Sequence, residues 1–209
     1  MDNVIETKEY NGVRLRIFQD EVGDCNPREW DNLGTIICFH NDYVLGDKND
    51  ISKSNFNSWN ELGDFLIEEK KAVVIFPIRI YEHSGISISI TNEYPYNDRW
   101  DSGQIGFIYC DRETILKEYN IKSITQKTIE KVKECLRAEI ETYNQYLTGE
   151  VFGYVLDKKV ICDKCSNIEY EHIDSCWGYY GNDFKKNGLS DNITDYEKFI
   201  NKEEVVEQI

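Results

Sequence analysis

Apolar and polar side chains alternate in several short segments of this chain, as they do in β-strands with one buried face. The pattern is clearest in residues 12–20, where three apolar residues are separated by Arg14 and Arg16. Residues 72–80 form the most apolar run, and Pro77 within it predicts a bulge or a sheet edge because proline donates no ladder hydrogen bond. The segments predicted as strands are residues 12–20, 35–40, 72–80, 86–90, 104–109, 150–160 and 168–173.

A period of three to four residues marks the predicted helices. Ser58 and Glu61 have the spacing of a helix capping box, which predicts a short amphipathic helix after them. Ser123 and Gln126 repeat this spacing at the start of a long helix that Gly149 is expected to end. Two further helices are predicted over residues 111–119 and 192–208.

The stretch from Ile80 to Asp111 holds two of the predicted strands, residues 86–90 and 104–109. We predict that these two strands pair with each other in antiparallel fashion. A compact polar turn precedes each strand, at residues 81–85 and 100–104. Because strand ends hold side chains rigidly, this stretch is where the sequence predicts a functional site.

Predicted strands outnumber predicted helices, and no regular strand, helix, strand alternation appears along the chain. The expected fold class is therefore α+β, with a mixed, mostly antiparallel sheet braced by one long helix, a C-terminal Cys/His hairpin and a terminal helix. With 209 residues, 40% of them hydrophobic, the chain is long enough to bury a core. We predict one domain over residues 1–209, with residues 150–181 as a small zinc-knuckle hairpin appended to it.

The chain is strongly acidic, with 39 aspartate and glutamate residues against 24 lysine and arginine residues and a net charge of -15. No basic cluster interrupts this excess, so we expect no direct binding to a nucleic-acid backbone. The acidity suits either a surface that mimics nucleic acid or a solvated surface that keeps the protein soluble. Neither a membrane-spanning segment nor a secretory signal is visible, so a cytoplasmic protein without membrane contact is expected.

Phosphate-loop, dinucleotide-binding, zinc-protease and nucleophile-elbow motifs are absent from the sequence. Polar and aromatic residues gather instead around the turns at His83 and Asp101. If these turns meet at one sheet edge, their imidazole, carboxylate, hydroxyl and amide groups suit a polar ligand with aromatic faces. The residues predicted to bind a ligand or a partner are His40, His83, Ser84, Trp100, Asp101, Ser102, Gln104 and Trp177.

The same residues allow two other interpretations. In the first, they are polar turn residues that cap strand ends and hold loops. In the second, they catalyse hydrolysis, with His83 as the base and Asp101 as the group that orients it. Cys176 or Ser84 would then be the nucleophile.

Four residues near the C-terminal hairpin have the spacing of a zinc site. Cys162 and Cys165 form a knuckle that offers two thiolates to one ion, and His172 and Cys176 complete a Cys3His set. A structural zinc ion is the predicted cofactor. Reduced surface thiols are the alternative, since a reducing compartment keeps cysteines free.

Several motifs of the chain resemble those of an uncharacterised family of small proteins encoded in phages, prophages and mobile elements. The resemblance covers roughly residues 10–185 and implies an accessory role, often directed at host defence or host metabolism. The motifs are WDNLG (30–34), His40 with Tyr43, LGD (45–47), HSG (83–85), WDSGQ (100–104), ETYNQYLTG (141–149) and DSCWGYYG (174–181).

The resemblance, the acidity and the missing catalytic motifs together favour a protein that acts by binding. The expected function is inhibition of a host defence system of the CRISPR or restriction type, with a host protein or nucleoprotein complex as partner and the host cytoplasm as location. A small hydrolase that uses His83 and Asp101, and a binder of a small nucleotide-like ligand, are the two alternatives.

Overall fold

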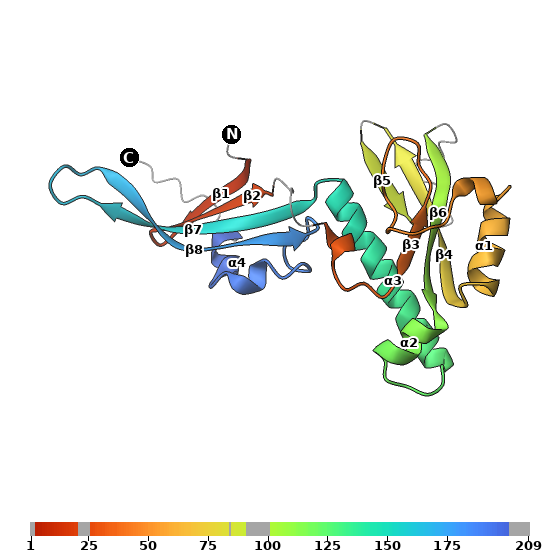
Figure 1. Cartoon of the computed structure of the whole chain (residues 1–209). Coiled ribbons are helices and arrows are strands. Elements are labelled where there is room, and N and C mark those ends of the chain that lie inside the picture. The colour runs from red at the N-terminus through yellow and green to blue at the C-terminus, as the bar shows by residue number, and fades with distance from the viewer. Residues whose placement is uncertain (1–2, 21–25, 84, 91–100, 201–209) are drawn as a thin grey trace. The chain divides into compact units, whose positions relative to one another are not determined.

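The computed structural model describes residues 3–20, 26–83, 85–90 and 101–200 (Figure 1). Within them there are four α-helices and eight β-strands, and the strands form two antiparallel sheets. This confirms the α+β class. The chain divides into two compact units, one made of residues 1–25 and 149–209 and the other of residues 26–148. Residues 150–181, expected as an appendage to a single domain, lie inside the first of two units.

The sheet of the first unit has the strand order β1-β2-β7-β8. Its strands are β1 (Val4–Tyr10), β2 (Val13–Gln19), β7 (Val151–Ile161) and β8 (Ile168–Tyr180). β1 was not predicted, although the Asn-Gly pair at residues 11 and 12 is the strongest short signal for a hairpin turn. Both turn residues have positive φ, at 48° and 74°.

The core of the first unit lies on one face of this sheet. Leu15 and Ile17 of β2 are buried, as their alternation with arginines predicts, and the short helix α4 (Tyr196–Ile200) packs on the same core. On the other face of β2, Arg14 and Arg16 both form ion pairs with the buried Asp157 of β7, at 2.8 and 3.0 Å. The predicted C-terminal helix beyond residue 200 lies outside the described residues.

The sheet of the second unit has the order β3-β6-β4-β5. Its strands are β3 (Thr35–Cys38), β4 (Ala72–Glu82), β5 (Ile86–Ser89) and β6 (Ser102–Asp111). The predicted pairing of β5 with β6 is wrong, because β4 lies between them and pairs with both. β5 runs antiparallel along β4, and the apolar β4 thus has a paired strand on each side.

Pro77 lies where β4 has only β6 as a described neighbour, since β5 pairs with residues 79–82 alone. The β4–β6 register shifts between Ile78 and Arg79, directly after this proline. The sequence predicts either a bulge or a sheet edge at this proline, and a missing donor is tolerated at both kinds of position.

Helices cover both faces of the second sheet (Figure 1). They are α1 (Trp59–Glu68), α2 (Arg112–Glu118) and α3 (Gln126–Leu147). Neighbouring strand residues point to opposite faces, so alternate side chains of β3 and β6 reach different helices. Ile37 and Tyr109 pack with Leu62 and Leu66 of α1, whereas Ile36 and Ile108 pack with Leu136 and Ile140 of α3.

A buried ion cluster fixes the chain before β3. The Arg28 side chain, only 7% exposed, pairs with Asp47 at 2.7 Å and with Glu139 of α3 at 3.2 Å. Glu139 also accepts hydrogen bonds from the backbone of Leu33 and Gly34, and so ties the end of the WDNLG motif to α3. Short 3₁₀ turns lie at Pro27–Glu29, Lys53–Asn55 and Ser190–Asn192.

Among the described residues, no helix combines the length and apolar character that crossing a membrane requires.

Candidate functional site

Strand directions bring the predicted turns of the second unit together. β3 and β4 both run antiparallel to β6, so the ends of β3 and β4 meet the start of β6 at one end of the sheet. The backbone N–H of Glu82 donates to the carbonyl of Asp101 at 2.8 Å, and the N–H of Phe39 donates to the carbonyl of Ile105 at 2.8 Å. His40, His83 and Asp101 therefore all lie near this end.

His83 and Asp101 are direct neighbours. The distance between His83 Nδ1 and Asp101 Oδ2 is 3.3 Å, and the side chains are 68% and 36% exposed. The His83 ring also stacks on the ring of Tyr81, with centroids 6.2 Å apart and planes 28° apart. An imidazole held through Nδ1 presents its Nε2 on the opposite side of the ring, where a ligand or a reacting proton can meet it.

His40 uses both ring nitrogens within the protein. Its Nδ1 accepts hydrogen bonds from the backbone N–H groups of Asp42 and Tyr43, and its Nε2 lies 3.3 Å from Glu82 Oε1. Because Nδ1 accepts hydrogen bonds, the ring proton is on Nε2, and the Nε2–H group points at the Glu82 carboxylate. This arrangement holds the loop after β3, so the geometry gives His40 a positioning role beside the predicted binding residues.

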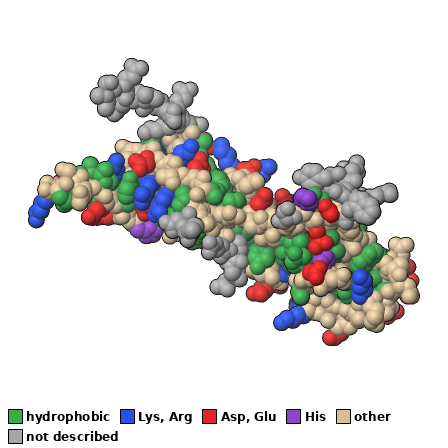
Figure 2. All heavy atoms as spheres, turned by 90° about the horizontal axis from the view of Figure 1, so that it is seen from above, with side chains coloured by type: hydrophobic (Ala, Val, Ile, Leu, Met, Phe, Trp, Pro, Cys, Tyr) green, Lys and Arg blue, Asp and Glu red, His purple; other side chains and the backbone are tan. Residues whose placement is uncertain are grey.

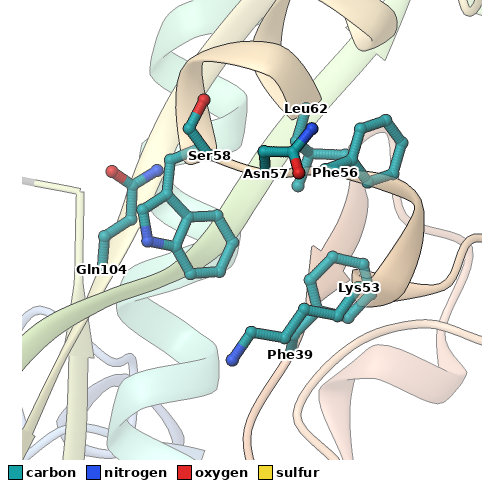
Figure 3. Close-up of a pocket in the computed structure, with 8 residues that line it drawn as sticks. Phe39, Lys53, Phe56, Asn57, Ser58, Leu62 and Gln104 are labelled. Carbon is teal, nitrogen blue, oxygen red and sulfur yellow. The ribbon is translucent and has the colours of Figure 1, made fainter.

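A pocket of about 340 Å³ lies on the α1 side of the same sheet (Figure 3). The rings of Phe39 and Trp59 are nearly parallel, with centroids 6.3 Å apart, and Phe107 meets Trp59 edge-on. Polar groups complete the wall. The lining residues are Phe39, Lys53, Phe56, Asn57, Ser58, Trp59, Leu62 and Gln104.

Strand pairing connects this pocket with the His83–Asp101 pair. Gln104 lines the pocket and is paired with Arg79 across the sheet, and Ser102 is paired with Tyr81 two positions further along. Directly paired residues share a face, as do residues two apart on a strand. The pocket side of the sheet therefore also includes Arg79, Tyr81 and Ser102. These residues lie between Gln104 and His83, whose ring stacks on Tyr81. We call this surface the α1-side band, defined by Phe39, Trp59, Arg79, Tyr81, His83, Asp101, Ser102 and Gln104.

Ser102 has an unusual environment within this band. Its hydroxyl oxygen is buried and has no hydrogen-bond partner among the described residues. Buried polar atoms normally have a partner, and an exception needs an explanation in each structure. A water molecule enclosed beside the strand is one such explanation.

Histidine side chains stand next to acidic ones on the surface of the second unit (Figure 2). This is consistent with the two pairs already described, His83 with Asp101 and His40 with Glu82. Of the other predicted residues, Ser84 and Trp100 lie outside the described residues.

Trp177 belongs to β8 of the first unit, together with Cys176. Its ring packs against Phe18 with centroids 5.4 Å apart. It also covers Gly153, where an added Cβ atom would come within 2.3 Å of the indole. These contacts give Trp177 a packing role in the first unit.

The four predicted zinc ligands are spread along the β7–β8 hairpin. Cys162 and Cys165 lie together in the turn, whereas His172 pairs with Asp157 and Cys176 with Tyr154 further along the strands. At about 3.3 Å per residue, His172 is roughly 13 Å and Cys176 roughly 26 Å along β8 from its first residue. Across the described ranges, no three His, Cys, Asp or Glu side chains are grouped to hold a metal ion.

Three cysteines of the second unit are in environments that suppress their reactivity. Burial raises the pKa of Cys38 and Cys110 to about 12 and that of Cys135 to about 11. Such thiols stay protonated at neutral pH and do not act as nucleophiles. They behave as small apolar side chains.

Residue patterns alone did not single out Phe39, Lys53, Trp59, Arg79 or Tyr81 as site residues. One signal for Arg79 and Tyr81 was present, because they occupy alternate positions at the end of β4, just before His83. The aromatic pocket had no such signal, since its walls come from three separate segments. Comparisons with family models, with curated proteins and with solved structures found no match to this chain.

Proposed function

We propose that this protein acts by binding, and that the α1-side band of the second unit is its binding surface. The observation that carries the proposal is the continuity of the band from the pocket at Gln104 to the His83–Asp101 pair. Concave sites with aromatic walls and a few converging polar groups are typical of small-molecule sites.

The chemistry of the band favours a nucleotide-like ligand. The rings of Phe39 and Trp59 offer apolar faces to a planar base, and the Gln104 amide offers both a donor and an acceptor for its polar edge. Lys53 adds a positive charge to the pocket wall, which suits a phosphate group.

A titration of mono- and dinucleotides by calorimetry tests this proposal, with Gln104→Leu as the variant and Gln126→Leu as the matched control. Gln126 lies at the exposed start of α3, away from the pocket lining. Loss of a hydrogen bond to a buried polar edge costs about 1–3 kcal/mol, so we expect Gln104→Leu to weaken binding by a factor of about 5 to 140. No binding of any nucleotide to the unmodified protein, or equal binding by both variants, contradicts the proposal.

The biological role that we propose is that of a phage-type accessory protein that inhibits a host defence system in the host cytoplasm. The resemblance to phage-encoded proteins and the net charge of -15 support this role, since an acidic surface fits a basic groove of a nucleic-acid-binding partner. Phage plating on defence-positive hosts, with and without the protein, tests it. Unchanged plating, together with no partner recovered from host lysate, speaks against it.

Hydrolysis is the second candidate, because the His83–Asp101 contact at 3.3 Å repeats the way a carboxylate orients a catalytic base through Nδ1. Single replacements then separate the two candidates. A hydrolase loses turnover with His83→Ala and Asp101→Asn while it still binds its substrate, and a binding protein shows no turnover in any form.

A further inference from the structure

We propose that Cys162 and Cys165 form half of a zinc site, and that a second copy of this chain supplies the other half. One Zn²⁺ then joins two hairpin tips through four thiolates. The site belongs to the first unit and is independent of the binding surface proposed for the second.

The two cysteines lie at the tip of an extended hairpin. β2 pairs with β7 only as far as Lys158, and the backbone N–H of Lys159 still donates to Gly12. Past this point the described strands leave β7 and β8 as a two-stranded ribbon that reaches beyond the four-stranded sheet (Figure 1). A tip of this kind can meet another molecule without a clash from its own sheet.

The turn has the local geometry of a metal knuckle. The N–H of Ser166 donates to the carbonyl of Cys162 at 2.8 Å, and Ser166 has a φ of 57°. The backbone N–H groups of Lys164 and Cys165, and the Cys165 thiol, donate hydrogen bonds to the Cys162 sulfur. The two sulfur atoms are therefore neighbours, as two ligands of one tetrahedral zinc ion must be.

A single chain cannot complete this site from its predicted ligands. A structural zinc ion takes four ligands in a tetrahedron, with zinc–sulfur distances of about 2.3 Å. His172 lies four positions beyond Ile168 along β8, outside that reach, and Cys176 lies further still. A second knuckle, related to the first by a two-fold axis, supplies the two missing thiolates, and the four thiols release their protons when the ion binds.

The surroundings of the knuckle also suit contact between two copies. Ile161 and Ile168 are directly paired at the base of the turn and share one face, although they are 58% and 53% exposed. Figure 2 shows hydrophobic side chains at the surface of the extended hairpin. A second copy that faces this isoleucine pair would remove its apolar surface from water.

Charge does not oppose the contact at the tip, in spite of the large negative charge of the chain. Residues 158–171, which span the ribbon and the paired strand ends at its base, contain three lysines and three acidic residues, so two tips meet without net repulsion. These charged residues are Lys158, Lys159, Lys164, Asp163, Glu169 and Glu171.

The test measures mass and bound metal together, in the presence of a phosphine reductant that prevents disulfides. Full-length protein is first treated with EDTA and then loaded with ZnCl₂, and its mass is read by light scattering. We expect a mass of 24.6 kDa without zinc and twice this value with zinc. Each chain supplies two thiolates and each zinc ion takes four, so we also expect about half an equivalent of zinc per chain.

The variants Cys162→Ser and Cys165→Ser should each abolish zinc uptake and the increase in mass. Cys176→Ser is the matched control, because Cys176 is an exposed cysteine of the same hairpin away from the turn. Ile161→Lys should weaken association at least tenfold with the cysteines intact. Ile173→Lys is its control and should not weaken association, because Ile173 is an exposed isoleucine of β8 away from the turn. Neither cysteine replacement should shift the melting temperature of the metal-free protein.

Several results would overturn the proposal. A monomer that holds one zinc ion per chain shows that the ligands come from a single copy. A dimer that persists in EDTA and reductant shows that the metal does not join the copies. Equal zinc uptake by Cys162→Ser and by the unmodified protein shows that the knuckle is not the site.

Discussion

His83 Nδ1 lies 3.3 Å from Asp101 Oδ2, although the two residues are 18 positions apart in the sequence. The contact exists because His83 follows the end of β4 and Asp101 precedes the start of β6, and these strands pair directly. The residues between them form β5 and the connection to β6, and β5 lies on the far side of β4. An exposed pair of this kind contributes only about 0–1 kcal/mol to stability, so either residue can be replaced with little effect on folding.

The first prediction concerns this pair. Asp101→Asn should leave the melting temperature within about 4 °C of the unmodified protein, because a surface ion pair contributes so little. The variant should nevertheless weaken ligand binding at the α1-side band. Asp195→Asn is the matched control, since Asp195 forms an exposed pair with Lys198 in the first unit. Calorimetric titration and a thermal melt measure both effects, and unaltered affinity in Asp101→Asn removes the pair from the binding surface.

The second prediction concerns the buried Arg28 cluster. Arg28→Ala leaves Asp47 and Glu139 without their shared cation, and breaking a buried ion pair in this way costs about 3–5 kcal/mol. Urea unfolding of the variant should therefore show a lower midpoint. Lys133→Ala, which removes an exposed partner of Glu130, should behave like the unmodified protein. Equal midpoints for the two variants would show that the cluster does not stabilise the second unit.

The third prediction concerns thiol reactivity. Because burial raises the pKa values of Cys38, Cys110 and Cys135 to about 11 or 12, iodoacetamide at pH 8 should leave all three unmodified in the folded protein. Cys162 should react fastest, since hydrogen bonds from Lys164 and Cys165 lower its pKa. Mass spectrometry of peptides measures the modification of each cysteine separately. Denaturant should make all of them react, and rapid native labelling of Cys110 would contradict the prediction.

The fourth prediction concerns pH. Burial raises the pKa of Asp20 above its ordinary value, and a hydrogen bond from the backbone of Gly178 only partly opposes this. A carboxyl group with a raised pKa in the folded state costs stability once pH exceeds its unfolded pKa, because the folded protein then resists ionisation. Asp20→Asn should therefore raise the unfolding midpoint in urea at pH 7 and leave it unchanged near pH 3. A stabilisation that is equal at both pH values would have another cause.

Local structure followed from the sequence because neighbouring residues determine it. Ser58 accepts a hydrogen bond from the N–H of Glu61, and Asp111 from that of Thr114, at helix starts that the sequence predicts. The start of α3 shows the limit of such patterns. Thr125, and not the predicted Ser123, caps this helix through the N–H of Thr128, because a short polar side chain two residues later offers an equivalent oxygen.

Tertiary structure alone decided which of these elements became neighbours. The alternation in residues 86–90 and 104–109 specifies two strands but not their partners, and β4 took the place between them because its apolar side chains gain contacts on both sides. The same strand order placed His83 beside Asp101, and the length of β8 separated His172 and Cys176 from the Cys162–Cys165 turn. Short-range patterns indicate secondary-structure propensity and which side chains are buried. The distance between residues far apart in sequence depends instead on the order and register of the strands, which many segments determine together.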